Sequence, residues 1–101
     1  MSETPWFVYL LLCQRNTIYT GVTPNLSARM KVHRDGRGAR FTRMNTPVRL
    51  LAAKAFQDKR SALQMEAQVK RMPVAGKRIL AGQWSEQYAI DEAAQHVLSG
   101  E

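Results

Sequence analysis

Two stretches near the start of the chain decide the fold, Trp6-Phe7-Val8-Tyr9-Leu10-Leu11-Leu12 and Ile18-Tyr19-Thr20-Gly21-Val22-Thr23. Both are rich in aromatic and β-branched residues, which favour strands, and the four residues between them, Gln14-Arg15-Asn16-Thr17, are polar. This spacing predicts a β-hairpin. Because the first stretch is almost continuously apolar, we expect it to form a central strand that is covered on both faces.

A helix, a loop and a third strand are predicted to follow the hairpin. Thr23 as N-cap and Pro24 as the first helical residue would begin the helix, which should end at about Arg34. Residues 35–47 are predicted as a loop, because two glycines lie near its start and no periodicity is present. Residues 48–56 are predicted as a strand, with a helix as the alternative because of their alanines.

The second half of the chain is predicted to be helical. Asp58 can cap a helix whose apolar residues recur at helical spacing, so that this helix should pack on the sheet through one stripe. Pro73 should stop or restart it, with a short helical segment over residues 74–81 before Gly82. The apolar stripe consists of Ala62, Met65, Val69 and Met72.

A last, acidic helix is predicted over about residues 85–98, with Ser85 as its cap. The order strand, strand, helix, strand, helix, helix, helix predicts an α+β fold, in which a small, mainly antiparallel sheet is flanked by helices. With 101 residues, the chain should be a single domain, 1–101, with a core at about 5–82. The weakly apolar face expected of the last helix comprises Tyr88, Ala89, Glu92, Ala93 and His96.

Positive charge is concentrated in the body of the chain. The net charge is +7, divided into +11 over residues 1–84 and −4 over residues 85–101. A planar guanidinium suits bidentate contact with phosphate, so the arginines indicate a polyanionic partner, with a merely solubilising surface as the alternative. Seven basic residues lie within 21 positions that hold one acid, Asp35, and these are Arg29, Lys31, Arg34, Arg37, Arg40, Arg43 and Arg49.

The sequence carries no sign of a membrane or of secretion. Its longest apolar run, Trp6–Cys13, is far shorter than the roughly 20 residues that a membrane-spanning helix needs. Met1-Ser2-Glu3 lacks the basic and apolar regions of a secretion signal. Cys13 is the only cysteine, which fits a reducing compartment, and we expect it to be a core residue. The predicted location is therefore the cytoplasm.

Four side chains of the hairpin and the first helix could share one site. Tyr9 and Tyr19 lie on consecutive strands at positions that can reach the same face. Arg29 and His33 are four residues apart on one face of the helix, so both can converge on a single phosphate. The ordinary alternatives are packing for tyrosines in strands and solvent exposure for a lone Arg or His on a helix.

Glu66 is a fifth candidate, because a carboxylate beside an apolar stripe is costly without a cation partner. It is the only acid between Asp58 and Glu86. An ion pair with Lys70, one helical turn later, is the simpler interpretation.

Taken in order, these residues resemble the signature of the GIY-YIG nuclease family. The resemblance rests on Phe7-Val8-Tyr9, on Tyr19-Thr20-Gly21 ten residues later, on Arg29 and on Glu66, and it covers roughly residues 5–82. The short stand-alone bacterial proteins of this family are the most similar. The resemblance implies a three-stranded antiparallel sheet flanked by helices, and metal-dependent hydrolysis of nucleic-acid phosphodiester bonds.

The resemblance also implies a role for each of the five candidates. Glu66 would hold one Mg²⁺ or Mn²⁺, and Arg29 would neutralise charge on the scissile phosphate. Tyr9 or Tyr19 would orient the attacking water or take its proton, and His33 would position that water or act as the base itself.

This chain departs from the family's pattern at several positions. Phe7 and Thr20 replace a glycine and an isoleucine of the signature, and no residue matches a further asparagine. Val22 stands where many members have a lysine, so that the missing cation would come from the later arginines. The residues that we expect to contact nucleic acid are these arginines and one lysine: Arg37, Arg40, Arg43 and Lys70.

The expected partner is nucleic acid, in the first place DNA, in repair or recombination, with a further protein supplying specificity. One alternative function is a non-catalytic nucleic-acid-binding module that keeps the fold. Another is a protein-interaction domain that docks through its acidic segment 85–101.

Overall fold

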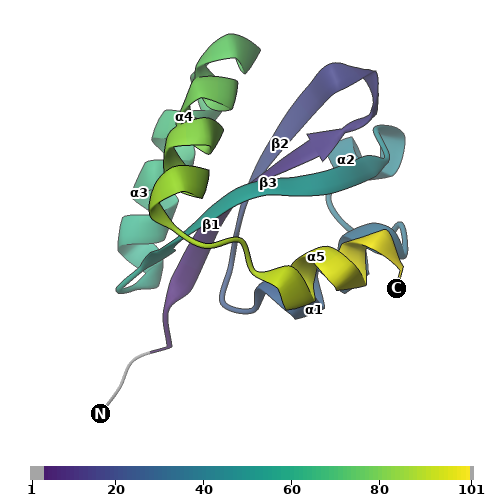
Figure 1. The fold of residues 1–101 in the computed structure, drawn as a ribbon, viewed down its shortest axis with the longest axis horizontal. Helices are drawn as coiled ribbons and strands as arrows, with labels where there is room; N and C mark the ends of the chain where they lie inside the picture. The colour runs from purple at the N-terminus through teal and green to yellow at the C-terminus, as the bar shows by residue number, and fades with distance from the viewer. Residues whose placement is uncertain (1–3, 101) are drawn as a thin grey trace.

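A three-stranded antiparallel sheet forms the centre of the molecule, as predicted (Figure 1). A computed structural model describes residues 4–100. Strands β1 (Trp6–Cys13) and β2 (Thr17–Thr23) form a hairpin joined by the short 3₁₀ turn η1 (Gln14–Asn16). Strand β3 (Pro47–Phe56) pairs with the other side of β1, so the apolar strand is central, as its sequence indicates.

Alternating side chains of β1 enter two separate cores on opposite faces of the sheet. Val8 and Leu10 pack with buried residues of α3 (Lys59–Lys70) and α4 (Val74–Gln87) on one face. On the other face, α1 (Leu26–Arg34) and α5 (Glu92–Ser99) cover residues that include Tyr9, Leu11 and Cys13. Figure 1 shows these two helix pairs on either side of the sheet.

The first helix begins two residues later than the sequence predicted. Thr23 is still part of β2, and Asn25 is the N-cap, with its side chain accepting a hydrogen bond from the backbone N–H of Ala28 at 3.0 Å. The Thr23 hydroxyl instead accepts from the backbone N–H of Asn25, which leaves Pro24 in the connection. The predicted end at Arg34 is confirmed.

The predicted loop 35–47 is wrong in its second half. Residues Arg40–Met44 form the short helix α2, which lacks any side-chain cap at its N-terminus. Only Thr42 of this helix is buried, and its hydroxyl donates to the carbonyl of Ala39 at 2.9 Å. A single helical turn without capping or periodicity leaves little trace in a sequence.

The last two helices also differ from their predicted bounds. Helix α4 does not stop before Gly82 but continues to Gln87, and Ser85 lies inside it, where its hydroxyl donates to the Gly82 carbonyl. Asp91 caps α5 through the backbone N–H of Ala94 at 3.0 Å. The expected face containing Tyr88 and Ala89 is therefore wrong, and the buried residues of α5 are Ala94 and Leu98.

Helix α3 follows its sequence pattern closely. Asp58 caps it by accepting from the backbone N–H of Ser61 at 2.7 Å, and Ala62 and Val69 of the stripe are buried. Met72 lies just beyond its end. Within residues 4–100, no helix is both long and apolar enough to cross a bilayer. Met1-Ser2-Glu3, used in predicting the location, lies outside the described residues.

Candidate active site

Four ring side chains gather on the α1 side of the sheet. The ring centroids of Tyr9 and Tyr19 are 6.2 Å apart, and His33 of α1 contacts both rings edge-on at 5.8 and 5.5 Å. Phe41 of α2 stacks on the outer side of Tyr19, with a centroid distance of 6.0 Å and an interplanar angle of 27°. The prediction that both tyrosines share a face with His33 is confirmed.

Gly21 leaves the space that the Tyr9 ring occupies. It is paired with Tyr9 across the hairpin, and a Cβ atom built on Gly21 would overlap the phenol of Tyr9. Gly38 has the same role beside α1, because a Cβ there would overlap the imidazole of His33 and crowd the Thr42 hydroxyl. At both positions a glycine is needed because a neighbouring ring lies against the backbone.

A directed chain of hydrogen bonds fixes the tautomer of His33. The Thr42 hydroxyl has one proton, which it donates to the Ala39 carbonyl, so it accepts from His33 Nδ1–H at 3.0 Å. In the neutral imidazole the other nitrogen, Nε2, is then an acceptor. The Tyr9 hydroxyl donates to it at 2.7 Å.

His33 is held in its neutral form. Burial in the ring cluster and, to a lesser extent, the positive charge of Arg29 together lower the pKa of His33 to about 4. The same burial raises the pKa of the Tyr9 phenol above its ordinary range. Tyr9 and His33 are thus uncharged at neutral pH, and Arg29 is the cation of the cluster.

The Arg29 guanidinium lies close to the phenols of Tyr9 and Tyr19. These contacts, above all that with Tyr9, raise the pKa of Arg29 and keep it charged. Because its hydroxyl is bonded to His33, the Tyr9 phenol beside Arg29 has a fixed position. Arg29 and His33 thus lie in one cluster, but His33 is buried with both ring nitrogens hydrogen-bonded, so of the two only Arg29 can reach a phosphate.

Burial separates the cluster into an inner and an outer half. Tyr9 is 0% exposed and His33 is 1% exposed, so neither reaches solvent. Tyr19 and Arg29 are partly exposed, and Phe41 is 39% exposed. A substrate arriving from solution therefore meets Tyr19, Arg29 and Phe41, while Tyr9 and His33 support them from behind.

Glu66 belongs to α3, which packs on the opposite face of the sheet from α1 and α5. Its half-buried carboxylate pairs with Lys70 at 3.5 Å, as the simpler interpretation held, and its charge also helps raise the pKa of the Tyr9 phenol. Among residues 4–100, no three His, Cys, Asp or Glu side chains are grouped to hold a metal ion. A lone carboxylate does not fit Zn²⁺, but it fits Mg²⁺, which keeps several waters and takes phosphate oxygens from a substrate.

The residues expected to contact nucleic acid differ in their surroundings. Arg37 pairs with Asp35 at 3.3 Å and Lys70 pairs with Glu66, so both are partly neutralised. Arg40 and Arg43 are exposed on α2, beside Phe41. Thr42 and Phe41 were not foreseen as parts of the site, and only the prediction of a helix at residues 40–44 could have indicated them.

Cys13 takes no part in this cluster. Its thiol is buried at the end of β1 and donates to the Leu11 carbonyl at 3.6 Å. Burial raises the pKa of Cys13 to about 11, which makes it a poor nucleophile. The expected core role is confirmed.

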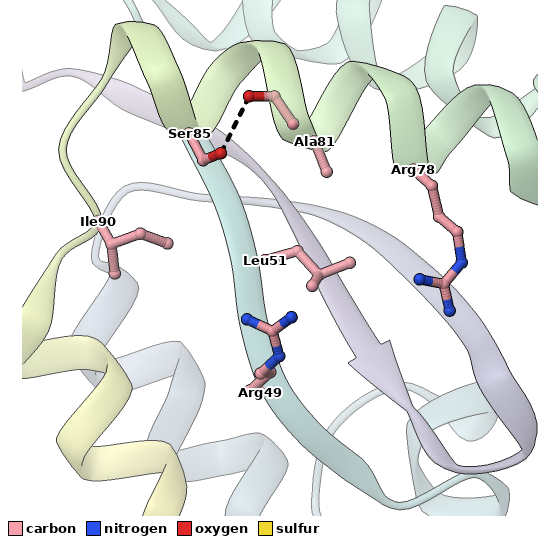
Figure 2. A pocket seen from close by; sticks show the side chains of 7 residues that line it. Arg49, Leu51, Arg78, Ala81, Ser85 and Ile90 are labelled. Atoms are coloured by element: carbon pink, nitrogen blue, oxygen red, sulfur yellow. Dashed lines mark hydrogen bonds between the residues drawn. The ribbon is translucent and has the colours of Figure 1, made fainter.

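A cavity of about 310 Å³ lies elsewhere, between β3 and α4 (Figure 2). Leu51 and Ala81, which belong to the core on the α3 and α4 side of the sheet, form part of its lining. Arg49 extends toward it from β3 and Arg78 from α4, and Ser85 lies further along α4 (Figure 2). It shares no residue with the ring cluster.

A three-stranded sheet that presents two phenols, an arginine and a histidine, with a glutamate on a later helix, defines a family of nucleases. The GIY-YIG catalytic domain family matches residues 5–75, and this chain belongs to it.

Several curated relatives are small bacterial proteins of the UPF0213 group, as the resemblance implied. The chain is 45% identical to one from Xanthomonas axonopodis pv. citri over 73 residues, 72% of each protein. It is 39% identical to one from Neisseria gonorrhoeae over 80 residues, 79% of this chain and 88% of the relative. The solution NMR structure of a UPF0213 protein from Bacillus halodurans is 34% identical, with a TM-score of 0.51, over 91% of this chain and 95% of that one.

Proposed function

We propose that this protein is a metal-dependent endonuclease that hydrolyses phosphodiester bonds in DNA. The observation that carries the proposal is the partly exposed pair of Arg29 and Tyr19, backed by the buried hydrogen-bonded pair of Tyr9 and His33. Arginine and phenol suit a phosphodiester, because the first is a permanent cation and the second can orient water. A role in repair or recombination and a cytoplasmic location, which the unpaired Cys13 thiol suits, belong to the proposal.

Arg29 and Tyr19 are the residues that act on the substrate in this proposal. The guanidinium of Arg29 binds the non-bridging oxygens of the scissile phosphate and neutralises the charge that develops there. The Tyr19 hydroxyl accepts a hydrogen bond from the water that attacks phosphorus. As the water oxygen bonds to phosphorus, the bond to the leaving oxygen breaks. The attacking water loses a proton to bulk water and the leaving oxygen takes one up from it, so the products are a phosphomonoester and a free hydroxyl.

Tyr9 and His33 are positioning residues. The Tyr9 hydroxyl donates to the fixed Nε2 acceptor of His33, so the phenol that lies close to Arg29 keeps one position. Because His33 stays neutral, it does not repel Arg29. In this arrangement only Arg29 and Tyr19, which are partly exposed, contact the substrate directly.

Glu66 is the residue that would hold a divalent ion. When bound, Mg²⁺ or Mn²⁺ would polarise the phosphate and stabilise the leaving oxygen. The ion pair with Lys70 leaves the other carboxylate oxygen of Glu66 available, since the contact joins Lys70 Nζ to Oε2.

The test is cleavage of labelled single-stranded, nicked, branched and duplex DNA, with matching RNA, in Mg²⁺ or Mn²⁺. We expect Arg29→Ala and Glu66→Gln each to lower kcat at least about 100-fold. Removing one preorganised electrostatic group from an enzyme active site has an effect of about this size. Arg60→Ala and Glu86→Gln are the matched controls, because both residues are exposed on helices outside the cluster. These two should cut like the wild type.

The alternative is a nucleic-acid-binding module without chemistry, which the departure at Val22 favours. It predicts that wild type, Arg29→Ala and Glu66→Gln all bind DNA and that none cuts it under any of these conditions. Equal cleavage by the wild type and Glu66→Gln would instead contradict the role of the glutamate.

A further inference from the structure

Phe41 is the outermost member of the ring cluster. It stacks on Tyr19 with an interplanar angle of 27°, yet 39% of it remains exposed. A single exposed apolar residue is ordinary on a protein surface. Phe41 differs from Met44 on the same helix, which is 66% exposed.

The rings form a continuous series from the surface to the interior. Phe41 contacts Tyr19, and Tyr19 contacts both Tyr9 and His33. Thr42, the next residue of α2, is anchored to His33 by a hydrogen bond. Phe41 is therefore held on a short helix that is tied at its neighbouring position, and its outer side faces solvent.

Two cations accompany this ring. Arg40 and Arg43 flank Phe41 on α2, both are exposed, and neither has a carboxylate partner among residues 4–100. An exposed aromatic ring with unpaired arginines on the same helical turn is a combination that suits single strands, in which bases stack on rings while cations contact phosphates.

We propose that Phe41 is a stacking platform for an unpaired base next to the scissile phosphate, with Arg40 and Arg43 on the flanking phosphates. The inference rests on the proposed function and adds the substrate class to it. Bases inside an intact duplex are already stacked and paired, so their faces are closed to Phe41 unless they are first extruded. The preferred substrate is therefore DNA with an unpaired nucleotide, such as a flap or a single strand.

The test measures binding without cleavage. Single-stranded, flapped and duplex DNA carrying 2-aminopurine at successive positions is titrated with full-length protein in EDTA. We expect fluorescence quenching at one unpaired position and weaker binding to the intact duplex. Phe41→Leu keeps an apolar cover on Tyr19 but cannot stack, so it should abolish the quenching and weaken single-strand binding about 5- to 150-fold.

Two further variants separate stacking from folding. Phe41→Trp restores an aromatic face and should retain the quenching, while Met44→Leu, on the same helix, should behave as wild type. Equal quenching by Phe41→Leu and wild type, or tighter binding to intact duplex than to any unpaired substrate, would overturn the inference.

Failure of this inference can be told apart from failure of the proposed function. A protein that cuts DNA but is indifferent to Phe41→Leu keeps the nuclease and loses the stacking site. A protein that quenches 2-aminopurine through Phe41 but cuts nothing in Mg²⁺ or Mn²⁺ keeps the stacking site and loses the nuclease. A protein that binds no nucleic acid overturns both.

Discussion

At the scale of single residues, His33 couples folding to pH. Burial lowers its pKa to about 4 in the folded protein, against roughly 6.5 in an unfolded chain. Between these two pH values the unfolded state binds more protons than the folded state. The contribution of His33 to the unfolding free energy is therefore complete above about pH 6.5 and is lost as the pH falls toward 4. The difference between the folded and unfolded pKa values of His33 corresponds to about 3 kcal/mol of unfolding free energy.

We therefore expect the urea midpoint to fall more steeply from pH 6.5 to 4 in the wild type than in His33→Gln. The carboxylates that also titrate in this range are common to both proteins, so the difference between the two curves isolates the histidine. Parallel curves would mean that His33 is not desolvated in the fold.

Thr20 is a second residue whose effect on the stability of the fold can be measured. It is 2% exposed, and its buried hydroxyl has no hydrogen-bond partner among residues 4–100. Thr20→Val keeps the shape and removes the unpaired group, so it should raise the unfolding free energy by about 1 kcal/mol. The expected rise in Tm is about 4–8 °C by calorimetry. A lower Tm would mean that the hydroxyl is in fact satisfied, for example by a bound water.

At the scale of elements, α5 protects the open edge of the sheet. Gln95 accepts from the Leu50 backbone N–H and donates to the Leu50 carbonyl, both at 2.9 Å. Strand β3 is an edge strand, and its register against β1 shifts next to Leu50. The amide thus replaces the pair of hydrogen bonds that a further strand would make.

Gln95→Ala should lower the unfolding free energy by about 1–3 kcal/mol, because it leaves two partly buried backbone groups unpaired. Denaturant titration gives this value, and hydrogen exchange should accelerate at the Leu50 amide in particular. Gln83→Ala, on the exposed side of α4, is the control and should change stability by less than about 0.5 kcal/mol. Equal effects of the two variants would contradict an edge-protecting role.

The accuracy of sequence prediction also varies with the element. The strands and α3 were predicted nearly to the residue. The composition of the strands and the apolar stripe of α3 are patterns within short segments, so the sequence of each segment is enough to indicate how it packs. The extent of α4 through Gly82 was missed because a glycine only weakens a helix, by about 1 kcal/mol, and contact with the sheet outweighs that cost. A Ser in the middle of a helix likewise resembles a cap until its neighbours are known.

For the whole molecule, the site was predictable where its members are close in sequence. Tyr9 and Tyr19 are brought together by one hairpin, and Arg29 and His33 by one helical turn. Phe41 joins them only because α2 docks on α1 through the His33–Thr42 hydrogen bond. That tertiary contact has no periodic signature, so Phe41 looked like one more residue of an arginine-rich loop.

The net charge of +7 allows the stacking and electrostatic parts of DNA binding to be measured separately. Each phosphate contact to a single strand adds about −0.7 to the slope of log K against log salt concentration. Replacing both Arg40 and Arg43 by alanine should therefore make the slope shallower by about 1.4. Phe41→Leu should weaken binding at every salt concentration without changing the slope, because stacking releases no counterions. If Phe41→Leu also flattened the slope, the ring would be acting by holding the two arginines in place, and the base would have no direct contact with it.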